Sequence, residues 1–107
     1  MGPLRARLHG KQAAHTLEIQ YLFPLYHGGQ GVPKPLNASQ VKLSQEMVSY
    51  WTRFAASGDP NSGATPAWPR FTASQERMQS LHPPAPAPIA AAAFADDHKC
   101  EFWDSLE

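Results

Sequence analysis

Apolar residues recur at intervals of three and four along residues 38–57 and form one stripe on a helical repeat: Leu43, Met47, Tyr50, Trp51 and Phe54. The flanking residues define both ends of this segment. Asn37 with Gln40 has the spacing of a capping box, Gly58 suits a left-handed residue after the last turn, and Pro60 prevents continuation. The sequence therefore predicts an amphipathic helix over 37–58 that must bury its stripe.

The rest of the chain has weaker periodicity. Residues 17–23 end at Pro24 and could form a short helix or a short strand, since the repeat does not distinguish the two. Glycine and proline mark Pro24–Pro35 as a loop, and residues 57–69 are equally rich in turn residues. We expect Arg70–Thr72 and Met78–Leu81 to form two short edge strands around a turn.

The C-terminal third begins with the proline and alanine composition of a linker, stiff first and then permissive for helix. A short helix is predicted beyond it, with Cys100, Trp103 and Leu106 on one side. The segments expected are thus 1–36, 37–58, 59–82, a linker at 83–95 and a helix at 96–107.

Composition predicts a small core. Of the 107 residues, sixteen are alanine, while valine, isoleucine, leucine and phenylalanine together number nineteen. Burial contributes about 25 cal/mol per Å² and must offset roughly 1–2 kcal/mol of backbone entropy for each ordered residue. The chain is therefore expected to be marginally stable alone and to pack against something else.

Neither the net charge nor the composition of any segment indicates a class of binding partner. The formal net charge is zero, which removes the electrostatic case for binding nucleic acid or an anionic membrane surface. No apolar run is long enough to span a membrane, and Met1–Arg7 lacks the apolar stretch of a secretory signal, so the chain as written is expected in the cytoplasm, with the localisation of a complete protein unknown. The single cysteine, Cys100, is either a buried thiol or half of a disulfide whose partner lies outside this chain.

Candidate chemistry centres on His15, which precedes an apolar run. A histidine by itself names no mechanism, because most are ordinary loop residues. No two of His9, His27, His82 and His98 have the short spacing of a zinc site, and no cofactor motif is present. Ser62 lacks the preceding glycine of a nucleophile elbow.

Three blocks in order then resemble the C-terminal part of the type B carboxylesterase family, the cholinesterase-like branch of the α/β-hydrolases. The first is His15-Thr16-Leu17-Glu18-Ile19-Gln20-Tyr21-Leu22-Phe23, which is similar to the family's segment around its histidine. The second runs from Tyr50-Trp51 through Phe54-Ala55 to Gly58-Asp59-Pro60-Asn61 and on to Trp68-Pro69-Arg70-Phe71. The third is Cys100-Glu101-Phe102-Trp103.

The resemblance implies an α/β fold, here a C-terminal fragment of an α/β-hydrolase, and a serine esterase acting on small carboxylic esters. It makes His15 the general base of a Ser–His–acid triad whose other members precede it in the chain order of the family, so we expect the chain alone to be inactive. Glu18 is too near His15 to be the family's acid and is expected to be a buried carboxylate with hydrogen-bond donors around it. Cys100 matches a position that in the family often pairs with an upstream cysteine.

An alternative from another class is a non-enzymatic interaction module. In that case the apolar face of the helix at 37–58 docks on a partner protein and the Pro/Ala segment is an arm. Under the esterase hypothesis the partner is the missing N-terminal portion of the same enzyme.

Overall fold

In the computed structural model, residues 17–23 and 35–107 are described, and the chain divides into two compact units, Met1–Pro35 and Leu36–Glu107. Each unit is considered by itself. The first contains α2 (Ile19–Leu22), a single helical turn. The amides of Tyr21 and Leu22 donate to the carbonyl of Glu18 at 3.0 and 3.3 Å. The segment whose periodicity allowed helix or strand is thus helical.

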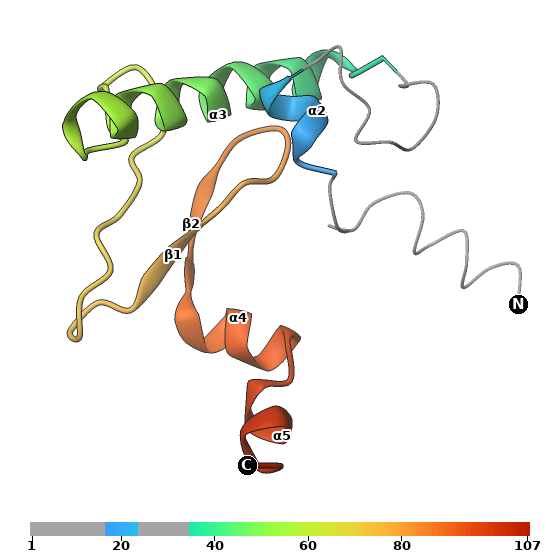
Figure 1. Cartoon of the computed structure of the whole chain (residues 1–107), viewed down its shortest axis with the longest axis vertical. Helices are drawn as coiled ribbons and strands as arrows, with labels where there is room; N and C mark the ends of the chain where they lie inside the picture. Colours follow the sequence, from blue (N-terminus) through green and yellow to red (C-terminus); the bar gives the residue numbers. More distant parts are fainter. Residues whose placement is uncertain (1–16, 24–34) are drawn as a thin grey trace, which may run out of the picture. The chain divides into compact units, whose positions relative to one another are not determined.

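The second unit is built on α3 (Ala38–Ser57), a helix of 20 residues where the apolar repeat predicts one (Figure 1). Its start is a complete capping box, because the Gln40 amide donates to Asn37 Oδ1 and the Asn37 amide donates to Gln40 Oε1, both at 2.9 Å. Its end is Gly58 in the left-handed conformation, with φ 78°, whose amide donates to the Phe54 carbonyl at 2.8 Å.

The apolar stripe of α3 divides into a buried and an exposed part. Leu43, Met47 and Tyr50 are at most 3% exposed. Trp51 and Phe54, which the sequence places on the same stripe, are 44% and 61% exposed. Val48 lies one turn before Trp51, and Val41 lies two turns before Val48 on the same side; both are exposed as well. One side of α3 is therefore apolar and uncovered.

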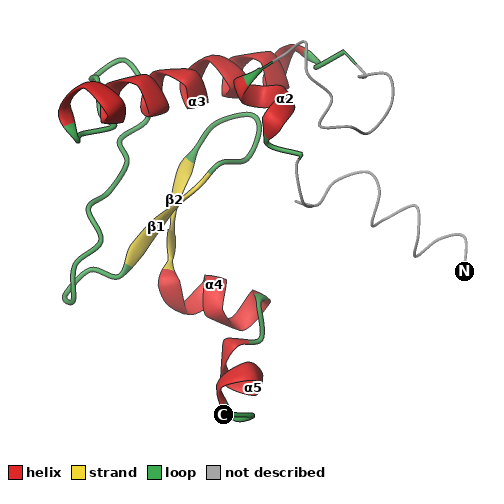
Figure 2. Ribbon diagram, viewed as in Figure 1, coloured by secondary structure: helices red, strands yellow, loops and turns green. Residues whose placement is uncertain are grey.

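A long connection without regular structure follows α3 and leads to an antiparallel hairpin, β1 (Arg77–Ser80) and β2 (Ala87–Ala90) (Figure 2). The strand predicted at Arg70–Thr72 is absent. Instead Thr72 and Gln75 exchange backbone hydrogen bonds of 3.1 and 3.2 Å, and the Thr72 hydroxyl accepts a third from the Gln75 amide. A threonine side chain that bonds nearby backbone favours a turn over a strand, so the turn lies earlier than expected.

The stretch expected to be a linker carries structure. After the loop 81–86, with a cis Pro83–Pro84 bond, β2 pairs Ile89 with Met78 and continues directly into α4 (Ala91–Asp97). Alanine has the highest helix propensity, and no proline follows Pro88, so the alanine run begins the helix.

The C-terminal helix also differs from expectation because it is divided. α4 ends at Asp97, and α5 (Cys100–Asp104) begins after Lys99, whose φ of 56° lies in the left-handed region. The His98 ring stacks on Phe94 at 3.9 Å, which closes the last turn of α4. Cys100 is half-buried, whereas Trp103 and Leu106 are exposed.

The core is as small as the composition predicts. Among the described residues, the buried hydrophobic side chains of the core are Leu43, Met47 and Tyr50, while ten large hydrophobic side chains are exposed. No helix in the described ranges is long and apolar enough to cross a membrane. The chain thus presents much of its apolar surface uncovered.

The capping box gives a first prediction. Replacing Asn37 with alanine removes the acceptor of the Gln40 amide, and we expect the free energy of unfolding to fall by about 1 kcal/mol. Gln45→Ala, at an exposed position within α3, is the matched control and should change it little. Urea unfolding followed by circular dichroism measures both; an equal effect of the two variants would mean that the cap contributes nothing.

Candidate functional site

His15, the predicted general base, lies outside the described residues, which begin at Leu17. Its assignment therefore stays a prediction. The described residue of that block nearest to it is Leu17, and the turn of α2 follows two residues later.

Glu18 differs from its expected role. It was predicted to be buried and surrounded by donors, yet its side chain is exposed and makes no capping hydrogen bond to α2. Its contribution is through the backbone, since its carbonyl accepts the first amides of the helix. An exposed carboxylate three residues from His15 needs no buried donors, because water solvates it.

Two of the remaining histidines are held locally by backbone oxygens. Nδ1 of His82 lies 2.5 Å from the Pro83 carbonyl, and Nδ1 of His98 lies 2.9 Å from the Phe94 carbonyl. His9 and His27 fall outside the described ranges. Over residues 17–23 and 35–107 no three side chains from histidine, cysteine, aspartate and glutamate gather as metal ligands would.

Ser62 and Cys100 occupy structural positions. The Ser62 hydroxyl accepts a hydrogen bond from the Ala64 amide at 3.2 Å, the arrangement of a serine turn. Cys100 is a free thiol at the first position of α5.

Three aromatic side chains form the best organised group in the second unit. Tyr50, Trp51 and Trp68, called here the aromatic cluster, meet edge to face: the Trp68 ring lies 5.0 Å from that of Tyr50 and 6.4 Å from that of Trp51. The Tyr50 hydroxyl donates to the Pro66 carbonyl and accepts from Nε2 of Gln79 at 3.3 Å. Trp68 thus anchors the irregular connection onto the end of α3.

A side-chain amide fixes Trp68 in this position. Asn61 Oδ1 accepts from the Trp68 amide at 2.6 Å, and Asn61 Nδ2 donates to the Trp68 carbonyl at 3.1 Å. The Asn61 amide in turn donates to Asp59 Oδ1 at 3.0 Å, directly after the left-handed Gly58. Gly58, Asp59, Asn61 and Trp68, four residues of the second sequence block, therefore each have a structural role in this connection.

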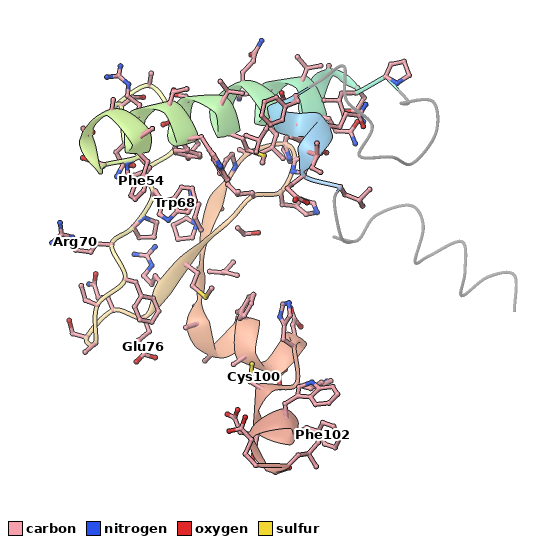
Figure 3. All side chains as sticks on the ribbon, viewed as in Figure 1. Phe54, Trp68, Arg70, Glu76, Cys100 and Phe102 are labelled. Carbon is pink, nitrogen blue, oxygen red and sulfur yellow. The ribbon has the colours of Figure 1, made fainter. Side chains whose placement is uncertain are left out.

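A cavity of about 660 Å³ opens beside the aromatic cluster. Its lining comes from the end of α3 and the connection that follows: Tyr50, Trp51, Phe54, Gly58, Asp59, Pro60, Asn61, Trp68, Pro69 and Arg70. Figure 3 shows Phe54 and Trp68 close together below the end of α3, with the Arg70 side chain directed away from them. The lining holds no histidine, serine or cysteine, so it supplies no member of a Ser–His or Cys–His pair for acyl transfer.

In comparison with known proteins, a single family model matches all of these segments. A model of the carboxylesterase family matches residues 4–103, which include His15, the helix α3, the Trp68 block and Cys100. The chain belongs to the carboxylesterase family. The resemblance read from the three sequence blocks is thereby confirmed, and the mixture of helices and short strands agrees with a partial α/β structure.

The individual relatives are named as esterases. The chain is 30% identical to carboxylesterase 5A of Mus musculus over 94 residues, which cover 86% of the chain and 16% of that protein. It is 30% identical to cocaine esterase of Homo sapiens, covering 86% of the chain and 15% of the relative. Acetylcholinesterase of Gallus gallus is 33% identical over 83% of the chain and 11% of its own length. The chain spans about a sixth or less of these relatives.

Asn61 holds Trp68 in the aromatic cluster, and the sequence analysis did not identify this role. Asn61 was quoted as part of the second block, but its hydrogen bonds to Trp68 were not predicted. The sequence contains one sign of these bonds: an asparagine follows Gly-Asp-Pro, and a Trp-Pro pair comes seven residues later. The amide of such an asparagine can bond one backbone N–H and one backbone C=O at once.

Asn61 gives a second prediction. Asn61→Ala removes both hydrogen bonds to the Trp68 backbone, and Asn61→Asp removes the donor while keeping an acceptor. We expect losses in unfolding free energy of about 1–3 kcal/mol for alanine and roughly half of that for aspartate, with tryptophan fluorescence shifted to longer wavelength as Trp68 becomes solvated.

Ser62→Ala is the control for this pair of variants, because it removes one local hydrogen bond and leaves Trp68 held. A fluorescence shift as large for Ser62→Ala as for Asn61→Ala would contradict the assigned role of Asn61.

Proposed function

We propose that this chain is the C-terminal portion of a serine carboxylesterase domain, an α/β-hydrolase, and that His15 is its triad histidine. The observation that carries the proposal is the family match over residues 4–103, which includes His15 in the block that resembles the family's histidine segment. The relatives are named carboxylesterases, a cocaine esterase and acetylcholinesterases. The substrate class proposed is therefore a small carboxylic ester.

In this mechanism His15 takes the proton of a serine hydroxyl as the serine oxygen bonds to the ester carbonyl carbon. It then gives that proton to the departing alcohol, which leaves an acyl-serine. Water attacks the acyl carbon while His15 accepts its proton, and His15 then returns that proton to the serine oxygen as the acyl C–O bond breaks and the carboxylic acid leaves. The serine, the acid that orients His15 and the oxyanion donors are proposed to come from the rest of the domain, and no metal or cofactor takes part.

Buried oxygens without a partner and exposed apolar side chains support the proposal that the rest of a domain packs on this chain. Within residues 17–23 and 35–107, three buried side-chain oxygens have no hydrogen-bond partner: Glu46 Oε2, Thr65 Oγ1 and Gln79 Oε1. Each such atom costs about 1–3 kcal/mol unless it is paired. The exposed side of α3, with Val41, Val48 and Trp51, adds apolar surface that a larger domain would cover.

The alternative interaction module is not favoured. Its helix face is partly occupied by the chain itself, because Tyr50 is 1% exposed and packs edge to face with Trp68. The family match also extends across the segment that this hypothesis treats as an arm.

The isolated chain provides a third prediction. Purified alone, it should hydrolyse a chromogenic short-chain ester no faster than buffer, because loss of triad members costs on the order of 10⁴ to 10⁶ in kcat. A complete esterase is the positive control. Turnover by the chain alone that approaches this control, and that a serine-directed inhibitor stops, would contradict the proposal.

A chimera provides a fourth prediction and tests His15 directly. In human cocaine esterase, the segment that aligns with this chain is replaced by residues 1–107. We expect this chimera to hydrolyse the ester and His15→Ala to lower kcat by about 10⁴-fold or more without changing the melting temperature.

His98→Ala is the matched control in the chimera, since the His98 ring lies 2.9 Å from the Phe94 carbonyl and stacks on the Phe94 ring, both within its own helix end. A folded chimera that hydrolyses no ester, or that keeps its activity after His15→Ala, would overturn the role proposed for His15.

A further inference from the structure

The two asparagines of the chain, Asn37 and Asn61, differ in the residues that follow them. Asn37 opens the triplet Asn-Ala-Ser, which has the Asn-X-Ser/Thr pattern at which N-linked glycans are attached. Asn61 opens the triplet Asn-Ser-Gly, in which the hydroxyl residue at the third place is missing. The sequence therefore contains one possible acceptor asparagine and one asparagine that serves as its natural control.

The Asn37 side chain makes its hydrogen bonds through its oxygen. Oδ1 accepts from the Gln40 amide and from the Ser39 hydroxyl, each at 2.9 Å. A backbone amide can only donate, which identifies the bonded atom as the side-chain oxygen rather than the nitrogen. Within residues 17–23 and 35–107, no hydrogen bond of Asn37 uses Nδ2. The cap of α3 thus needs only one of the two polar atoms of this amide.

Exposure and chemistry make Nδ2 of Asn37 suitable for a large substituent. Asn37 and the alanine that follows it are both exposed, so a group attached there extends into water. An N-linked sugar replaces one hydrogen of Nδ2 and leaves the amide carbonyl intact. Oδ1 can therefore still accept the Gln40 amide after the sugar is attached.

Asn61 shows the opposite arrangement. Both of its side-chain polar atoms bond the backbone of Trp68, with Nδ2 donating to the Trp68 carbonyl at 3.1 Å. A sugar on that nitrogen would crowd the turn that holds Trp68 against Tyr50. The asparagine with the acceptor triplet is thus also the one whose nitrogen is not needed by the fold.

We propose that Asn37 is an acceptor site for an N-linked glycan, and that the glycan and the cap of α3 use different atoms of the same side chain. The donor is an oligosaccharide linked to a lipid diphosphate, in a cell whose oligosaccharyltransferase modifies secreted chains. Nδ2 bonds to the anomeric carbon of the first sugar as the bond from that carbon to the diphosphate oxygen breaks. The lipid diphosphate leaves, and the Nδ2 proton passes to a base of the transferase. His15 and ester hydrolysis have no part in this inference.

Attachment is tested by producing the full chain behind a cleavable secretion signal in cultured mammalian cells and mapping its peptides from cells and medium together. We expect the Asn37 peptide to carry a glycan that peptide N-glycosidase removes in heavy-oxygen water, leaving an isotope-labelled aspartate. Asn37→Asp and Ser39→Ala should abolish the glycan, Ser39→Thr should keep it, and the Asn61 peptide should carry none. An unmodified Asn37 peptide, or a glycan that survives Ser39→Ala, would overturn the proposal.

The use of different atoms is tested through stability. An endoglycosidase that leaves one N-acetylglucosamine gives a uniform glycoform of the chain. We expect this glycoform and Asn37→Asp to melt within about 2 °C of the unmodified chain, and Asn37→Ala to melt about 4–8 °C lower. A glycoform that melts as low as Asn37→Ala would mean that the sugar disrupts the cap, which contradicts the proposal.

Hydrogen exchange of the Gln40 amide gives a readout that needs no cooperative melting. This amide should exchange about fivefold more slowly in the glycoform than in Asn37→Ala, because Oδ1 still accepts it. Equal exchange rates in the two would overturn the proposal.

The cocaine esterase chimera tests the site in a larger domain. The chimera should carry the glycan on Asn37 and fold with it. A chimera that folds only when Asn37 is unmodified would mean that another part of the domain covers this side chain, and the proposal would be wrong. Loss of ester hydrolysis in His15→Ala, or its persistence, leaves the glycan on Asn37 unchanged, so the two proposals fail separately.

Discussion

The burial of Tyr50 is the interaction on which the second unit depends. A phenol can be almost fully buried only if its hydroxyl is bonded, and here it donates to the Pro66 carbonyl while it accepts from Gln79. These two bonds join three parts of the chain that are otherwise far apart in sequence: the helix α3, the irregular connection and the strand β1. The ring adds a contact with Trp68. One side chain thus substitutes for part of the hydrophobic core that the composition cannot supply.

The family's densest signature lies around this residue, and it specifies backbone geometry. Gly58 provides a left-handed end to α3, Asp59 accepts from the Asn61 amide, and Asn61 bonds both polar groups of the Trp68 backbone. Such a turn would otherwise leave N–H and C=O groups near the apolar end of the helix unpaired. The signature is therefore a solution to a folding problem, and the chemistry proposed for the family's histidine lies in a different segment of the chain.

Sequence reasoning succeeded where a local rule decides the outcome. The ends of α3 follow from side chains at Asn37 and Gln40 and from a glycine with positive φ, so the caps could be predicted. The strand pairing could not, because β1 pairs with a segment that reads as a polyproline linker, and Pro88 is accepted only since its missing N–H points outward. The split between α4 and α5 depends on the φ of Lys99, and a lysine gives no sign of that conformation in sequence. The exposed face of α3 depends on what covers it, which no local pattern specifies.

Membership of the family does not by itself establish activity, because the residues that identify this chain are not the residues that would catalyse. The residues that make this chain recognisable satisfy backbone groups of the chain itself, so they retain their role even where the nucleophile is missing. A catalytic histidine has no such support, because its function requires a serine and a carboxylate held at hydrogen-bond distance by other segments. Membership in the carboxylesterase family therefore follows from residues 4–103, whereas ester hydrolysis requires the remainder of the domain to place its serine and acid against His15.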